Sequence, residues 1–203
     1  MYTASLTAAL GGVTQRQLAH WRNGRRPLLV PEANHGRSIR YSFRDLVAIR
    51  TMGALRTGFP LQRIRTAVAH LQRLDDVEHL SRYRLVGDGR TIVWAAGDEL
   101  VDLLARPGQR VLITMHDVLD AFVGWTGATI VPLRRPKPGV SIDPLVLGGF
   151  PVVEDTRIPY DTIAGLADDG LDTAAIRFFY PTVTRTGVEG AVAFDDYVAS
   201  YAA

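Results

Sequence analysis

Four polar side chains follow a pair of glycines near the start of this 203-residue sequence. They are Gln15, Arg16, His20 and Arg22. Amide, guanidinium and imidazole groups donate hydrogen bonds of the kind that phosphates and base edges accept. The types and spacing of these residues therefore indicate contact with a nucleic acid, and we expect the major groove of double-stranded DNA.

The helix that carries these side chains has recognisable boundaries. Gly11-Gly12 allows a tight turn because glycine accepts positive φ, and Thr14 is a favourable N-cap. Leu18 and Trp21 are three residues apart, so we expect them to face a core. A shorter helix at about residues 5–10 completes a helix-turn-helix. Two helices joined by glycine also occur in folds that never contact DNA, and these residues alone leave that alternative open.

Charge is distributed unevenly along the chain. Residues 1–73 carry a net charge of +10, residues 74–140 carry −1 and residues 141–203 carry −7, while the whole chain carries +2. A basic beginning favours a polyanionic partner, and the acidic end favours a different one.

Composition excludes several classes of protein. The sequence has no cysteine, so disulfides, thiolate metal sites and cysteine nucleophiles are excluded. It shows no signal peptide and no apolar run near the roughly 20 residues of a membrane span. We therefore expect a cytoplasmic protein without a membrane partner.

Further elements extend the basic region. Residues 37–41 are β-prone and flanked by arginine, which predicts a short hairpin, or wing. Ser42 and Asp45 form a capping box that begins a helix ending near Leu55, and Pro60 opens another helix. The apolar stripe of that helix is Leu61, Ile64, Val68 and Leu71. The stripe is the expected dimer surface, and packing on the rest of the basic region is the alternative.

The order of these elements, with the runs Arg40–Leu46 and Leu55–Leu61 and the pair Ile64-Arg65, resembles the MerR-type winged helix-turn-helix over about residues 2–74. The resemblance implies DNA contacts from the second helix, the wing and the first turn of the third helix. The residues at these positions are Thr14, Gln15, Arg16, Gln17, His20, Trp21, Arg37, Arg40, Tyr41 and Arg44, and Arg22 follows from the helix itself. One such unit contacts few base pairs, so we expect a homodimer on an inverted-repeat operator.

The chain departs from that family after its fourth helix. MerR-type activators continue into a long dimerising helix and often hold a metal with cysteines. This sequence breaks at Asp75-Asp76 and has no cysteine, so a metal sensor is not expected.

The middle segment, residues 75–133, is predicted to be a mixed α/β connection that can contribute to dimerisation. Turn residues at 87–90 predict a β-hairpin. The expected strands lie at 83–86, 91–94, 110–114 and 129–131, and the expected helices at about 98–104 and 116–123. Residues 134–140 are basic and interrupted by proline, which predicts a linker or extended arm.

Residues 141–203 predict a compact module of three short helices separated by glycine and proline. Its motifs are Gly148-Gly149-x-Pro151, Thr156-Arg157-Ile158-Pro159 and Tyr180-Pro181. Over residues 142–197 they resemble the small, formally uncharacterised helix-turn-helix domain of antitoxins paired with PIN-domain ribonucleases. With the first resemblance, this one implies a VapB-type antitoxin.

The acidic charge of this module disfavours a second DNA-binding role. The resemblance implies a nuclease partner with a basic surface for RNA, which an acidic, aromatic segment can cover. The expected partner contacts are Phe178, Asp195, Asp196, Tyr197 and Tyr201. In the alternative, Tyr197 packs in the module's own core and the aspartates are solvated.

Catalytic patterns are missing from the sequence. It contains no glycine-rich phosphate loop, no HExxH and no Gly-x-Ser-x-Gly. Adjacent acidic pairs such as Asp195-Asp196 point about 100° apart on a helix, which is typical of a solvated face and not of a metal site. We therefore expect neither an enzyme nor a cofactor.

The sequence as a whole predicts a mainly α protein with a small β component. It comprises a winged helix-turn-helix head (residues 1–74), a short β-hairpin extension and a small three-helix tail (residues 141–203). The predicted function is an antitoxin that represses its own operon and neutralises a PIN-domain ribonuclease. The alternative is a one-component regulator that senses a small molecule through its middle or tail.

Overall fold

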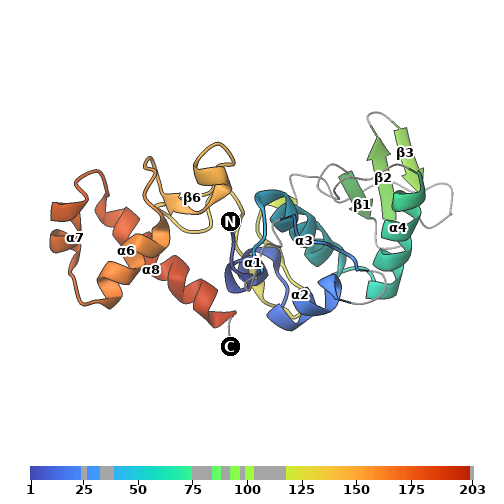
Figure 1. Cartoon of the computed structure of the whole chain (residues 1–203), viewed down its shortest axis with the longest axis horizontal. Helices are drawn as coiled ribbons and strands as arrows, with labels where there is room; N and C mark the ends of the chain where they lie inside the picture. The colour runs from blue at the N-terminus through green and yellow to red at the C-terminus, as the bar shows by residue number, and fades with distance from the viewer. Residues whose placement is uncertain are drawn as a thin grey trace.

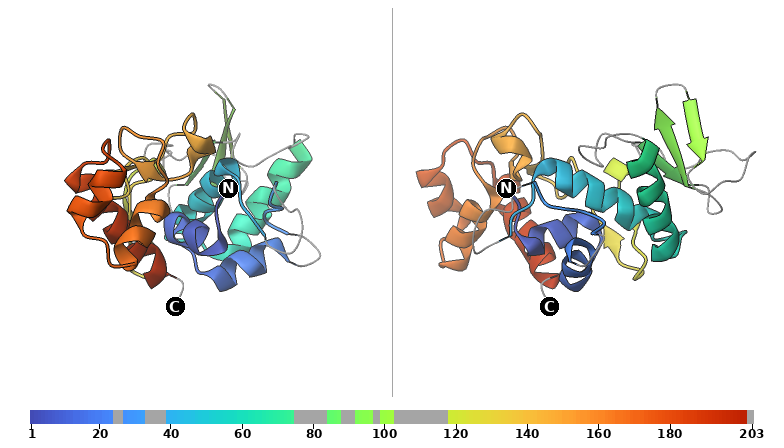
Figure 2. Two further views of the ribbon diagram at one scale, coloured as in Figure 1. Left: turned by 60° about the vertical axis from the view of Figure 1, so that its left-hand side comes forward. Right: turned by 45° about the vertical axis from the view of Figure 1, so that its right-hand side comes forward.

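The computed structural model describes residues 1–23, 27–32, 39–74, 84–87, 92–96, 99–102 and 118–201. Within them the head contains α1 (Ala4–Gly11), α2 (Gln15–Arg22), α3 (Phe43–Leu55) and α4 (Leu61–Leu74). The tail contains α6 (Tyr160–Asp168), α7 (Thr173–Phe179) and α8 (Arg185–Ser200). Figures 1 and 2 show the tail helices on one side of α1–α3 and α4 on the other.

Short antiparallel strands supply the β component. A three-stranded sheet beside α4 has the order β1 (Arg84–Gly87), β2 (Ile92–Ala96), β3 (Glu99–Asp102) (Figure 1). Two smaller pairs are β4 (Phe122–Val123) with β5 (Thr129–Ile130), and β6 (Val140–Ser141) with β7 (Val152–Val153). The 3-10 turn η2 (Leu147–Gly149) lies between β6 and β7. The mainly α fold with a small β component is confirmed.

The structure confirms part of the predicted middle segment and corrects the rest. The predicted hairpin is β1–β2, with Leu85 opposite Trp94. The helix predicted at 98–104 is wrong, because residues 99–102 form β3 on the open edge of β2. A short amphipathic run is compatible with a helix or a strand. Here it forms a strand because β2 offers an unpaired edge to which residues 99–102 hydrogen-bond. The helix predicted at 116–123 is wrong over its last two residues, because Phe122 and Val123 form strand β4. The strand predicted at 110–114 lies outside the described residues.

The predicted linker at 134–140 is instead packed on the tail. The Ile142 N–H donates to the Arg134 carbonyl at 2.9 Å, and Val140 is fully buried in β6. A Cβ atom at Gly190 of α8 would lie 2.0 Å from the Pro138 carbonyl oxygen. Glycine therefore permits this close crossing, a long-range contact that composition does not reveal.

Side-chain caps define the ends of the head helices, as the sequence predicts. Thr14 Oγ1 accepts from the Gln17 N–H at 3.1 Å, and Gln17 Oε1 accepts from the Thr14 N–H at 2.7 Å. Ser42 Oγ likewise accepts from the Asp45 N–H at 3.0 Å, and Asp45 Oδ2 accepts from the Ser42 N–H at 2.8 Å. Both reciprocal pairs are capping boxes at helix N-termini, and both helices begin where expected.

The apolar stripe of α4 packs largely within the chain. Ile64 and Val68 are buried together with Ala67, and Leu61 is half-buried. The side chain of Leu71 lies outside the described part. This packing matches the alternative given for the stripe, and the homodimer remains a prediction.

Head and tail share one hydrophobic core. The Tyr2 hydroxyl donates to the Gly149 carbonyl, and the Tyr197 hydroxyl donates to the Ala9 carbonyl at 2.9 Å. A series of rings runs from the head into the tail, with successive centroids 4.7 to 6.2 Å apart. Its members are Tyr2, Phe150, Tyr160, Phe194 and Tyr197. The tail is therefore not an independent appendage.

A fully buried arginine, Arg50 of α3, lies where the head meets the segment after the β-sheet. Its guanidinium donates to four backbone carbonyls, those of Leu10, Val118, Asp120 and Val131. The Phe122 ring lies 5.0 Å from its central carbon. Burial lowers the pKa of Arg50 to about 10, so the side chain stays charged at neutral pH. Arg50 thus joins α1, α3 and residues 118–131.

We expect Arg50→Leu to lower the free energy of unfolding by about 2–4 kcal/mol, because buried carbonyls lose their donors while apolar volume is retained. Urea denaturation followed by circular dichroism measures this change. Arg40→Leu, at an exposed position of the head, is the control, with an expected change within about 0.5 kcal/mol. A loss below about 1 kcal/mol for Arg50→Leu would show that the four contacts contribute little.

Candidate nucleic-acid interface

Helix α2 has one buried side and one polar side. Leu18 and Trp21 are each 2% exposed and pack in the core. Arg16 and His20 are exposed, and Gln15 and Gln17 are half-buried at the start of the helix. The helix N-terminus also contributes a positive dipole end, which favours phosphate. This arrangement matches what a helix needs to enter the major groove.

Two of the predicted contacts also hold the helix in place. The Gln15 side-chain amide donates to Ser5 Oγ of α1 at 3.2 Å. The Gln17 carbonyl oxygen accepts from the Thr14 N–H in the capping box. Thr14 and Gln17 therefore fix where α2 begins. Gln15 links α2 to α1, and its side chain remains partly exposed at the start of the helix.

Arg65 of α4 is a further candidate contact that sequence reasoning missed. Its Nη2 lies 3.3 Å from His20 Nε2, which must be the acceptor because a guanidinium only donates. The polar surface of α2 therefore continues onto α4. The repeated arginines of the predicted helix after Pro60 indicate a basic surface, but the sequence does not show which of them faces α2.

Two predicted DNA contacts, Trp21 and Tyr41, are corrected by the structure. Trp21 is 2% exposed and Tyr41 is 1% exposed, so neither offers surface to DNA. The Tyr41 backbone pairs with that of Tyr2 through hydrogen bonds of 2.9 and 3.0 Å. Its hydroxyl accepts from Arg22 Nη1 at 3.0 Å, so Tyr41 positions Arg22. Both aromatic side chains are adjacent in sequence to basic residues but pack in the hydrophobic core.

The remaining basic candidates belong to elements other than α2. Arg40 and Arg44 are exposed, and Arg37 lies outside the described residues. Arg44 Nη1 lies 3.1 Å from a carboxylate oxygen of Glu32. A surface pair of this kind contributes about 0–1 kcal/mol and exchanges readily for a phosphate. Glu32 and Asp45 are the acidic residues among positions 1–73, and Asp45 is buried.

The predicted partner contacts in the tail fall into two groups. Phe178 at the end of α7 is 81% exposed. Asp196 is exposed and Asp195 half-exposed on α8. Burial, together with the charges of Asp168, Asp196 and Asp161, raises the pKa of Asp195. These three predicted contacts are accessible to a partner.

Tyr197 and Tyr201 belong to the second group. Tyr197 donates to Ala9 and accepts from the Val131 N–H at 3.5 Å, so its hydroxyl joins tail to head. Burial raises the pKa of Tyr197. The Tyr201 ring packs 5.3 Å from that of Tyr197. The prediction that Tyr197 contacts a partner is therefore corrected, and its packing extends beyond the tail's own core.

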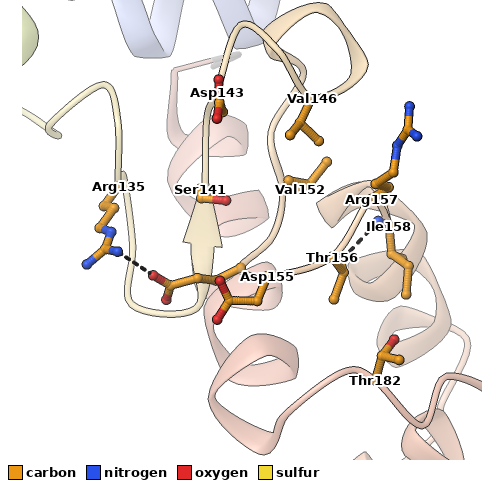
Figure 3. Close-up of a pocket in the computed structure, with 11 residues that line it drawn as sticks. Arg135, Ser141, Asp143, Val146, Val152, Asp155, Thr156, Arg157, Ile158 and Thr182 are labelled. Atoms are coloured by element: carbon orange, nitrogen blue, oxygen red, sulfur yellow. Dashed lines mark hydrogen bonds and ion pairs between the residues drawn. The ribbon is translucent and has the colours of Figure 1, made fainter.

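A second feature of the tail is an open cavity of about 610 Å³ beside β6, β7 and the turn at 155–158 (Figure 3). Thr156 Oγ1 accepts from the Ile158 N–H at 3.0 Å and donates to the Val153 carbonyl, so the Thr156–Pro159 motif is a structured turn. Figure 3 shows Arg157 extending outward from this turn. Arg135 and Glu154 form an ion pair of 3.0 Å at the cavity edge.

The described residues contain no group of three or more histidine, aspartate or glutamate side chains placed to hold a metal ion. None of the described helices is long and apolar enough to cross a membrane. The absence of an enzyme activity and of a cofactor remains a prediction.

Comparison with known proteins identifies both ends of the chain. Residues 2–80 match the family described as MerR HTH family regulatory protein. Residues 140–194 match the family described as Protein of unknown function (DUF433). The chain therefore has a MerR-family helix-turn-helix domain at its N-terminus and a DUF433 domain at its C-terminus. No curated protein matches the chain.

The X-ray structure of Rv2018 from Mycobacterium tuberculosis is similar to this one. The TM-score is 0.55 at 18% sequence identity, and the match covers 94% of this chain and 96% of the other. At this identity the likeness shows a shared fold along nearly the whole chain, including the combination of head and tail.

We expect Arg16→Ala to relax preference at one base pair by about 1–3 kcal/mol and to leave folding unchanged, because the side chain is exposed on α2. Trp21→Ala, in contrast, should lower the free energy of unfolding by about 3–5 kcal/mol through loss of core packing. Fluorescence anisotropy with duplexes altered one base pair at a time, and urea denaturation, measure the two effects. Equal weakening of all duplexes by Arg16→Ala would assign that residue to phosphate alone.

Proposed function

We propose that this chain is the antitoxin of a type II toxin–antitoxin pair. Its MerR-family head binds an inverted-repeat operator as a homodimer and represses the chain's own operon. Its DUF433 tail binds and neutralises a PIN-domain ribonuclease. The MerR-family match supports DNA binding, and the nuclease partner comes from the resemblance of the tail.

The main support for DNA binding is that α2 has one apolar side in the core and one polar side facing solvent. The apolar residues of this helix are buried, its cap is complete, and Arg16 and His20 face outward. The net charge of +10 over residues 1–73 adds a sequence-independent attraction to phosphate. Arg65 beside His20 widens the same surface.

The charge and exposed aromatic residues of the tail support the partner-binding part. Residues 141–203 carry −7, which opposes contact with DNA and suits a protein with a basic RNA-binding surface. Phe178, with its ring 5.5 Å from that of Phe179, leaves a large apolar area exposed on α7. Exposed aromatic pairs on an otherwise polar surface are typical of protein interfaces.

A small-molecule regulator is the second candidate, and the 610 Å³ cavity of the tail favours it. Cavities of this size accommodate metabolites. The cavity is open and its lining is mixed, with both signs of charge. Because head and tail share one core, a ligand that changes the packing of the tail would also change the position of the head helices.

We expect the full chain to bind its own upstream DNA in preference to random DNA, with log affinity falling linearly as log salt rises, because the head displaces counterions from phosphate. Electrophoretic mobility shifts at several salt concentrations measure both properties. Sedimentation of the complex should give two chains on each inverted repeat. A monomer on DNA, or no preference over random DNA, would overturn the operator part of the proposal.

We expect a PIN-domain nuclease encoded beside this chain to co-purify with it and to lose RNA cleavage in the complex. Phe178→Ser should weaken the complex at least tenfold, whereas Val123→Ser, which removes an exposed apolar side chain from β4, should leave it unchanged. Truncation is unsuitable because the tail shares the head's core. A metabolite that alters DNA affinity in the absence of any nuclease neighbour would favour the second candidate instead.

A further inference from the structure

The tail contains a groove that is separate from the cavity of Figure 3 and that shares one residue, Asp196, with the predicted partner contacts. It lies where the end of α6 and the start of α7 meet one side of α8, and has a volume of about 470 Å³. Its apolar lining consists of Ala167, Leu171, Val188, Val192 and Ala193. Val192 is half-exposed and Ala193 exposed, so the groove is accessible from solvent.

The groove has the dimensions of a helix-docking site. Val188, Val192 and Asp196 are four residues apart and lie on one side of α8. From Val188 to Asp196 the helix rises about 12 Å, which equals roughly two turns of a second helix. A helix that presents two or three apolar side chains at spacings of three or four residues therefore matches this surface.

Carboxylates surround the apolar lining. Asp172, Glu189 and Asp196 line the groove, and none of the described residues that line it is lysine or arginine. Arg185, one turn before Glu189, forms an exposed ion pair with it at 2.8 Å. The Asp172 side chain accepts from the Ala175 N–H as the N-cap of α7.

Asp195 of α8 lies near other carboxylates of α6 and α8 that repel it. The charges of Asp168, Asp196 and Asp161 contribute to raising the pKa of Asp195, after burial. Asp168 ends α6, where the helix dipole is unfavourable for an anion. Of these four carboxylates only Asp196 lines the groove, so a cation bound there is attracted by Asp196 and by the two other lining carboxylates, Asp172 and Glu189.

We propose that this groove binds a basic amphipathic helix of the partner ribonuclease, with apolar side chains on Val192 and Leu171 and with lysine or arginine facing the surrounding carboxylates. The inference rests on the proposed function for the identity of the partner. Charge complementarity selects the occupant, because a protein that binds RNA has a basic surface patch and the groove is surrounded by carboxylates.

A second copy of this chain does not supply such a helix from its described residues. The arginine-rich helix α4 has Ile64 and Val68 buried within its own head, and α2 has Leu18 and Trp21 buried in the same way. The apolar stripe that the groove requires is therefore already used in both helices. Among the described residues, neither of these two helices of a second copy is therefore a suitable occupant.

The first test uses the full chain and a labelled synthetic helix of about 14 residues, with leucine at every third or fourth position flanked by arginine. A scrambled peptide of the same composition and a version with glutamate in place of arginine are the comparison probes. Fluorescence anisotropy should show binding of the basic amphipathic peptide at least tenfold tighter than either comparison. Equal binding of all three peptides would overturn the proposal.

The variant Asp172→Asn/Glu189→Gln/Asp196→Asn removes the three charges while asparagine retains the cap of α7. It should weaken peptide binding at least tenfold, and Val192→Gln should do the same by making the lining polar. Asp143→Asn/Glu154→Gln/Asp155→Asn is the matched control, because it removes the same side-chain types from the other cavity. Affinity of the groove variant within twofold of the control would exclude the groove.

The nuclease itself separates this proposal from the function on which it rests. If the wild-type chain neutralises the nuclease and the groove variant does not, both proposals are supported. If the groove variant neutralises it as well as the matched control does, the groove proposal fails and the antitoxin function stands. If the wild-type chain does not bind the nuclease, the antitoxin function fails, and tight binding of the basic peptide alone would still locate a helix-docking site.

Discussion

The buried guanidinium of Arg50 is the contact on which the DNA-binding head depends. It donates to carbonyls from α1, from residues 118–120 and from Val131. A buried carbonyl without a donor is costly, so these groups constrain one another through a shared partner. Arginine suits this role because its planar group has five donors and can serve several acceptors at once, which lysine does not do with the same geometry.

The end of α1 shows how this contact reaches the DNA-binding surface. The last carbonyls of a helix have no partner within it. In α1 the Ala9 carbonyl accepts from Tyr197 of the tail, and the next one, of Leu10, accepts from Arg50. The glycine turn into α2 follows immediately. The direction in which α2 leaves that turn therefore depends on α3, on residues 118–131 and on the tail together, although these three parts are far apart in the chain.

The division of charge has a structural counterpart. The basic residues of the head that remain exposed, such as Arg16, Arg40 and Arg44, lie on or near α2 and α3, while α6 and α8 of the tail carry exposed acids. Opposite charges at the two ends suit two partners of opposite charge. Because head and tail share a core, the two oppositely charged surfaces belong to a single body, and the hydrogen bond of Tyr197 to Ala9 links α8 directly to α1.

The sequence by itself determined the features that depend on neighbours within a few residues. The caps at Thr14 and Ser42, the turn at Gly11-Gly12 and the hairpin of β1 and β2 follow from local hydrogen bonds and turn chemistry. The polar side of α2 follows from helical spacing, so the core of the candidate DNA-binding site was also predictable. The same local signals could not assign Trp21 and Tyr41, because a large aromatic residue suits a binding surface and a core equally well.

Tertiary structure decided everything that required distant partners. Tyr197 bonds to Ala9 across 188 positions, Tyr2 to Gly149 across 147, and Arg50 to Val131 across 81. Residues 134–140 have the composition of a linker, yet α8 presents Gly190 where they cross and packs them in place. Residues 99–102 fit a helix by pattern, yet β2 offers them an open edge. In each case the outcome depends on which surface the rest of the chain brings alongside, and no local window of sequence contains that information.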